Sequence, residues 1–149
     1  MFLGSTTSTI DAKGRTSVPA PFRSVVDEDA VYVWPSVHGG FLEGGGRALM
    51  EQMQREIFER VAEGSLSPEA AEAQQMAVLG AARRLSFDKT GRTVLPEEFR
   101  NHADLGINAT FVGLGNRFEI WEPGAHEDRM RAAREKAKTT RLLGAPRFS

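Results

Sequence analysis

The sequence contains no cysteine, one tyrosine and two tryptophans among its 149 residues. Without cysteine, a disulfide scaffold and a thiolate zinc site are both excluded. No run of residues approaches the ~20 apolar positions that a membrane-spanning helix needs. Residues 1–11 lack the basic start and the apolar core of a signal peptide. We therefore expect a cytoplasmic protein without a membrane partner.

Excess charge of one sign is also lacking, because the net charge is only −1. The charges are unevenly placed: residues 27–75 hold ten acidic and three basic residues, whereas residues 125–149 hold seven basic and three acidic ones. The net charge alone argues mildly against a nucleic-acid partner. The local distribution of charge matters more than the total, and it leaves basic segments that could contact a nucleic acid.

Signs of catalysis are missing as well. The three histidines, His38, His102 and His126, do not have the spacing of metal ligands. No spacing in the chain suggests a Ser-His-Asp arrangement. The glycine-rich run at 39–46 lacks the Gly-Lys-Ser/Thr ending of a phosphate-binding loop. We expect no enzymatic activity, no metal, no cofactor and no small-molecule substrate.

An internal repeat is the most informative feature that is present. Residues 11–23 recur at 88–100, and Asp, Gly, Arg, Thr, Pro, Phe and Arg match without a gap at a constant offset of 77 positions. Each copy begins with an aspartate, which favours turns, and reaches a glycine, which tolerates positive φ. An arginine follows the glycine directly. The repeat predicts two similar half-domains, each with an exposed arginine beside a tight turn.

The residue pattern predicts a mixed α+β chain. Each half is expected to be a strand, a turn, a return strand, a short helix and a further strand pair, and two helices are expected to join the halves. The expected strands are 5–10, 15–18, 31–34, 40–42, 85–87, 92–95, 109–113 and 117–121, and the expected helices are 20–26, 47–63, 67–83, 97–103 and 125–140.

The repeat divides the chain into four parts. Residues 5–47 and 82–124 are the expected half-domains, residues 48–81 are a helical insert, and residues 125–149 are a basic C-terminal helix with its tail. A half of roughly 40 residues buries too little surface to be stable alone. The two halves are therefore expected to form one pseudo-symmetric unit.

The motifs resemble those of the MraZ family of bacterial transcriptional regulators. The resemblance rests on Met-Phe-x-Gly at the N-terminus, on Asp-x-Lys-Gly-Arg-x-Ser-Val-Pro at 11–19, on the second copy at 88–96, and on Arg-Phe-Glu-Ile-Trp-Glu at 117–122. It implies two fused AbrB-like swapped-hairpin half-domains of the SpoVT-AbrB type, forming one β-barrel-like unit. It also implies a ring-shaped homo-oligomer that binds guanine-rich direct repeats in double-stranded promoter DNA, as a nucleoid-associated repressor of the division and cell-wall gene cluster.

The turns suggest how such a protein would read DNA. Arg15 and Arg92 are expected to contact guanine, because an arginine fork pairs bidentately with guanine O6 and N7. Lys13 and Lys89 suit phosphate contacts. Asp11, Gly14, Asp88 and Gly91 are expected to support the turns, with each aspartate bracing an arginine or capping the turn. The alternative without a binding role is that each Asp–Arg pair is a surface salt bridge, which contributes roughly 0–1 kcal/mol to stability.

So few basic groups per turn would bind a single DNA site weakly. Several subunits on several repeats would multiply weak contacts through effective concentration. Two alternatives remain open. One is an AbrB-like antitoxin, and the other is an oligomeric scaffold that does not bind DNA.

Overall fold

The computed structural model describes residues 1–144, and within them it has eight strands, five α-helices and one π-helical turn. The strands are β1 (Ser5–Thr9), β2 (Arg15–Ser17), β3 (Ala30–Pro35), β4 (Leu42–Gly45), β5 (Arg83–Ser86), β6 (Arg92–Val94), β7 (Asn108–Gly113) and β8 (Phe118–Trp121). The helical elements are α1 (Ala20–Arg23), α2 (Arg47–Glu63), α3 (Pro68–Gln74), η1 (Gln75–Leu79), α4 (Glu97–His102) and α5 (Pro123–Ala137). The expected α+β class is confirmed.

Six strands form one antiparallel sheet in the order β1-β7-β8-β4-β3-β5. Strands that correspond through the repeat stand at mirrored places in this order: β1 with β5, β7 with β3, and β8 with β4. The remaining two strands, β2 and β6, also correspond to each other and form a separate two-stranded ribbon. An approximate two-fold axis therefore relates the two halves of the chain.

The return strands do not form simple hairpins with the strands that precede them. β2 pairs with β6 of the other half rather than with β1, and β1 pairs with β7. The turns are also joined across the halves: the Val18 N–H donates to the Gly91 carbonyl and the Leu95 N–H to the Gly14 carbonyl, both at 2.8 Å. Interleaving lets the two small halves share one core, which neither half could build alone.

Phenylalanine rings fill the centre of this shared core. Phe2 meets Phe22 and Phe118 edge to face, with ring centroids 5.3 and 5.2 Å apart. Phe22 comes from α1 and the equivalent Phe99 from α4, and both are 1% exposed. Pro19 and Pro96 stand immediately before these two helices, where proline's fixed φ suits a helix start. The repeated phenylalanines thus pack in the core, and the repeated prolines precede the helices that carry them.

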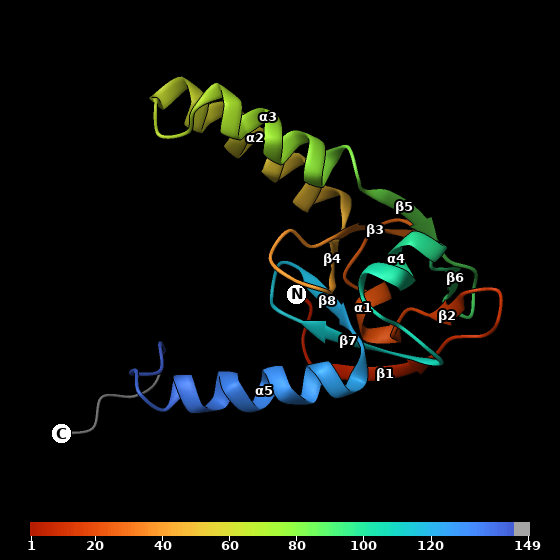
Figure 1. The fold of residues 1–149 in the computed structure, drawn as a ribbon. Helices are drawn as coiled ribbons and strands as arrows, with labels where there is room; N and C mark the ends of the chain where they lie inside the picture. The colour runs from red at the N-terminus through yellow and green to blue at the C-terminus, as the bar shows by residue number, and fades with distance from the viewer. Residues whose placement is uncertain (145–149) are drawn as a thin grey trace.

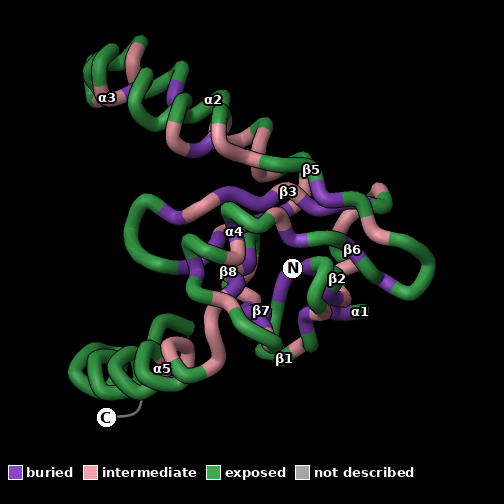
Figure 2. Tube along the Cα trace, turned by 45° about the vertical axis from the view of Figure 1, so that its right-hand side comes forward, coloured by how far each residue is buried: buried purple, intermediate pink, exposed green. Residues whose placement is uncertain are grey.

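Two helical arms extend away from the sheet (Figure 1). One consists of α2, α3 and η1, and the other is α5; both are largely exposed along their length (Figure 2). Gly64, at φ +80°, ends α2, and the Ser67 hydroxyl accepts from the Ala70 N–H to begin α3. Glu122 begins α5 by accepting from the N–H groups of Gly124 and Ala125.

Several expected bounds need correction. The helix expected at 67–83 gives way to the π-helical turn after Gln74 and ends at Leu79, because β5 starts at Arg83 and pairs with β3. The helix expected at 20–26 ends at Arg23. The last helix covers Pro123–Ala137 rather than 125–140. The end of the expected tail, residues 145–149, lies outside the described residues.

Candidate nucleic-acid interface

The ribbon of β2 and β6 presents two arginines on its outer face. The antiparallel register places Arg15 opposite Val94, Thr16 opposite Thr93, and Ser17 opposite Arg92. Neighbouring residues of a strand point to opposite faces. Thr16 and Thr93 are buried on the inner face, whereas the side chains of Arg15 and Arg92 are 46% and 48% exposed. Both guanidinium groups are accessible from the solvent side of the ribbon.

The two turns that lead into the ribbon share one backbone geometry. In the first, the Asp11 N–H donates to the Arg15 carbonyl and the Gly14 N–H to the Asp11 carbonyl, both at 3.0 Å. The second repeats these bonds between Asp88, Arg92 and Gly91 at 3.0 and 2.9 Å.

Gly14 and Gly91 are buried, with φ of +85° and +89°. A Cβ on Gly14 would lie 2.7 Å from the Leu95 carbonyl oxygen, and a Cβ on Gly91 would lie 2.5 Å from Arg23 Nε. Both the left-handed conformation and the close approach require glycine. This explains why the repeat keeps glycine at these positions.

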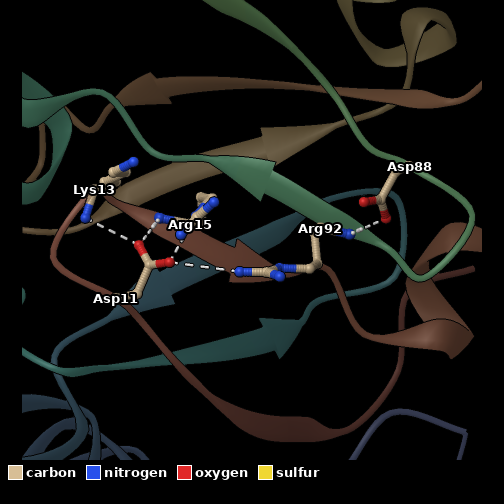
Figure 3. A network of polar contacts seen from close by, with 5 residues as sticks. All are labelled: Asp11, Lys13, Arg15, Asp88 and Arg92. Carbon is tan, nitrogen blue, oxygen red and sulfur yellow. Dashed lines mark hydrogen bonds and ion pairs between the residues drawn. The ribbon is translucent and has the colours of Figure 1, made fainter.

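The Asp11 carboxylate lies at the centre of a polar network (Figure 3). Its Oδ1 accepts from the backbone N–H groups of Lys13 and Arg15, at 3.0 and 2.9 Å. Its Oδ2 accepts from Arg15 Nε at 2.6 Å and from Arg92 Nη2 at 3.4 Å. The bond from the Arg15 N–H is the main cause that lowers the Asp11 pKa from 3.8 to about 2, with the Arg15 side chain and the Lys13 N–H adding to it.

Asp88 occupies the equivalent place but has different partners. Its Oδ1 accepts from the N–H groups of Thr90 and Arg92, both at 2.9 Å, and from the Thr90 hydroxyl at 2.7 Å. The Arg92 N–H is the main cause that lowers the Asp88 pKa, followed by the Thr90 hydroxyl. The Arg92 guanidinium turns instead toward Asp11 of the other half.

The lysines of the turns, Lys13 and Lys89, are both exposed. Within residues 1–144 neither forms an ion pair with a carboxylate. The structure therefore brings Arg15, Arg92 and Asp11 together, and it leaves the lysines on the adjoining turns with their charges available.

One basic residue beside the ribbon was missed by reasoning from the repeat. Arg84 of β5 lines a shallow hollow of about 370 Å³ together with Arg15, Asp88 and Arg92. Its Nη2 lies 3.0 Å from Oε1 of Glu28. The position 77 residues earlier is Thr7, so the repeat gives no signal for it. The only clue in the sequence is that Arg84 lies close to the second turn, two residues before the end of the strand that leads into it.

A larger hollow of about 730 Å³ lies elsewhere, between the N-terminus and the start of α2. Neither Arg15 nor Arg92 lines it. Within residues 1–144, no three side chains of the metal-ligating types come together, and no helix has both the length and the apolar character to cross a bilayer. The ribbon is the candidate site because Arg15 and Arg92 lie together on its exposed face.

The other repeated arginines, Arg23 and Arg100, have a structural role. Arg23 Nε donates to the Val18 carbonyl and Arg100 Nε to the Leu95 carbonyl, each at 3.1 Å. Each bond joins the short helix of a half to the end of its own ribbon strand. The motif therefore carries two kinds of arginine, one exposed and one built into the fold.

Comparisons with known proteins point to one family. Residues 78–145 match the family model described as "MraZ protein, putative antitoxin-like". Proteins named "Transcriptional regulator MraZ" are similar over nearly the whole chain. The one from Beijerinckia indica subsp. indica is 39% identical, with 94% of this chain and 85% of that protein covered. The one from Azorhizobium caulinodans is 38% identical, with 94% and 88% covered.

A third relative of the same name, from Rhodospirillum rubrum, is 34% identical, with 97% of this chain and 93% of that protein covered. These alignments span both halves, the helical arms and the doubled turn with its ribbon. Both copies of the motif therefore lie within the region of similarity, and the chain belongs to the MraZ family.

Proposed function

We propose that this protein is a sequence-specific DNA-binding transcriptional regulator, without enzymatic activity, that reads double-stranded DNA with the β2–β6 ribbon. The observation that carries the proposal is the presence of Arg15 and Arg92 on one exposed face of a two-stranded antiparallel ribbon. The major groove of B-DNA admits such a ribbon. The names of the relatives support a role in transcription.

Each group of the two turns has a part in this proposal. Arg15 and Arg92 donate to guanine O6 and N7, the commonest specific contact of arginine with DNA. Lys13 and Lys89 contact phosphates from the exposed turns. The aspartates and glycines of the motif hold the turns in shape, as their hydrogen bonds and positive φ angles support.

The preferred target is promoter DNA with guanine-rich direct repeats, upstream of the division and cell-wall gene cluster, where the protein acts as a repressor in the nucleoid region of the cytoplasm. A homo-oligomeric ring provides the avidity. With a net charge of −1, one subunit can neutralise few phosphates, and linked subunits on successive repeats multiply the weak contacts.

The fold proposed for DNA binding consists of two AbrB-like swapped-hairpin halves, residues 5–47 and 82–124. The two halves close into a barrel-like unit. The helical insert at 48–81 and the C-terminal part at 125–149 are appended to it. The pairing of β2 with β6 and of β1 with β7 supports an exchange of strands between the halves.

A titration of fluorescent promoter DNA with guanine-rich repeats, over a range of salt concentrations, tests the function. A scrambled duplex of equal length is titrated in parallel, and the particle mass is measured. The double variant Arg15→Ala/Arg92→Ala should lose the preference for the repeats, since each good bidentate contact contributes about 1–3 kcal/mol of discrimination. Arg55→Ala, an exposed arginine of α2, is the matched control and should bind as wild type does.

Each competing interpretation gives a different result. A scaffold would form the oligomer and show no preference for the repeats at low salt. Specific binding that survives the double variant would refute the assignment of the two arginines. Tight binding by a monomeric variant would refute the argument from avidity. An antitoxin would bind a second protein, a toxin, in addition to its operator.

A further inference from the structure

One carboxylate serves both arginines of the ribbon, although each arginine has an aspartate four positions before it. Asp11 Oδ2 accepts from Arg15 Nε at 2.6 Å and from Arg92 Nη2 at 3.4 Å (Figure 3). Asp88 forms no hydrogen bond or ion pair with either guanidinium among the described residues. The backbone of the two turns is symmetric, whereas the charge network between them is not.

The two copies of the motif differ at the residue two positions after the aspartate. Thr90 stands where the first copy has Lys13. Its hydroxyl donates to Asp88 Oδ1 at 2.7 Å, and the N–H groups of Thr90 and Arg92 donate to the same oxygen. Lys13 has no hydroxyl and gives Asp11 only its backbone N–H. All three donors to Asp88 thus meet Oδ1, and no hydrogen bond or ion pair within residues 1–144 reaches its Oδ2, whereas Oδ2 of Asp11 accepts from both guanidinium groups.

We propose that Asp11 is the common positioning residue for both arginine forks, which rests on the proposed DNA-reading function. Arg15 is held through Nε, so both of its terminal amino groups stay free to meet a base edge. Arg92 is held through one terminal amino group, so its Nε and other amino group stay free. Fixing both side chains before DNA arrives lowers the entropy cost of binding. One carboxylate thus holds both side chains and leaves further donors on each of them free.

The chain offers a matched pair of variants to test this role. Asp11→Asn and Asp88→Asn each remove one negative charge from the same place in a turn, and each keeps an oxygen that can accept the backbone N–H groups. Only Asp11→Asn removes the acceptor that the guanidinium groups share.

Two readouts are used. The NMR signals of the arginine Nε–H groups are recorded for the free protein, and a purely structural role would not shift those of Arg15 and Arg92 selectively. The affinities for a duplex with one guanine-rich repeat and for a scrambled duplex are measured at one salt concentration. Asp11→Asn should shift the signals of both arginines and lower the ratio of the two affinities about two- to tenfold. Asp88→Asn should leave both signals in place and lower the ratio less, because Asp88 supports only the backbone of the second turn.

The proposal is overturned if Asp11→Asn leaves both signals and the ratio unchanged, or if Asp88→Asn changes them equally. A wild-type protein without preference for the repeat would refute the DNA-reading function instead. In that case the NMR comparison still decides whether Asp11 holds both forks.

Discussion

Thr16 and Thr93 lie directly opposite each other in the β2–β6 ribbon, and both side chains are buried. They are equivalent residues of the repeat, 77 positions apart, so the approximate two-fold axis passes through this pair. The Oγ1 atom of Thr16 is buried without a hydrogen-bond partner within residues 1–144. The inner face of the ribbon thus has, beside this axis, a buried hydroxyl group that makes no hydrogen bond within residues 1–144.

Replacing Thr16 with valine should therefore stabilise the protein. Valine has nearly the same shape, and a buried polar group without a partner costs about 1–3 kcal/mol. We expect Thr16→Val to raise the free energy of unfolding by about 1 kcal/mol, measured by urea denaturation. Thr93→Val is the control at the symmetric place, where the hydroxyl is not left buried without a partner, and its gain should be smaller. A loss of stability in Thr16→Val would show that the hydroxyl has a partner in solution.

Gly14→Ala should destabilise the fold more than Gly64→Ala. Both glycines have positive φ, +85° and +80°, and a side chain in that region costs about 1–2 kcal/mol. A Cβ on Gly14 would also lie 2.7 Å from the Leu95 carbonyl oxygen, whereas a Cβ on Gly64 would meet nothing within 4 Å. We expect an additional loss of at least about 1 kcal/mol for Gly14→Ala in thermal or urea unfolding. Equal losses would contradict the close approach of the turn to the other half.

The two kinds of repeated arginine should separate in experiment. Arg100→Ala removes the Nε–H that donates to the Leu95 carbonyl, and it should lower stability by about 1–3 kcal/mol. Arg92→Ala, on the exposed face, should change stability by less than about 0.5 kcal/mol while it lowers the affinity for the guanine-rich duplex. Urea unfolding and DNA titration of the same two variants test this, and a reversal of the two effects would refute the assignment.

Asp11 should make stability depend on pH in acid. Its pKa is lowered to about 2 in the folded protein, from 3.8, chiefly by the Arg15 backbone N–H. A folded pKa below the unfolded value stabilises the protein above pH 3.8, and the contribution is lost as the pH falls toward about 2. The difference in free energy of unfolding between wild type and Asp11→Asn should therefore shrink over this range. A difference that stays constant with pH would show that the carboxylate is not held in this way.

The sequence predicted much of the local structure. Gly14 and Gly91 marked turns that have the expected positive φ, and the short helices expected from residues 20 and 97 begin at those residues. These features depend on interactions between near neighbours in the chain. That Arg15, Arg92, Lys13 and Lys89 bind DNA stays a prediction.

Strand partners and the charge network could not be predicted in the same way. β2 pairs with β6 because two distant halves share a core, and no pattern within residues 5–18 records that choice. The repeat also suggested that Asp88 would serve Arg92. The Arg92 guanidinium instead reaches Asp11 of the other half, a partner that becomes visible only in the folded chain. Long-range pairing and competition between acceptors are properties of the folded chain.

The pairing of β1 with β7 determines when the protein can fold during synthesis. Ser5 is joined to Val112 and Thr9 to Asn108, so the first strand has no partner until most of the chain has left the ribosome. Contacts of such sequence separation slow folding and leave strand edges open in the meantime. Until the second half has been synthesised, the phenylalanines of the first half stay exposed to solvent. Translation speed and chaperone access during that interval therefore bear on the yield of folded protein.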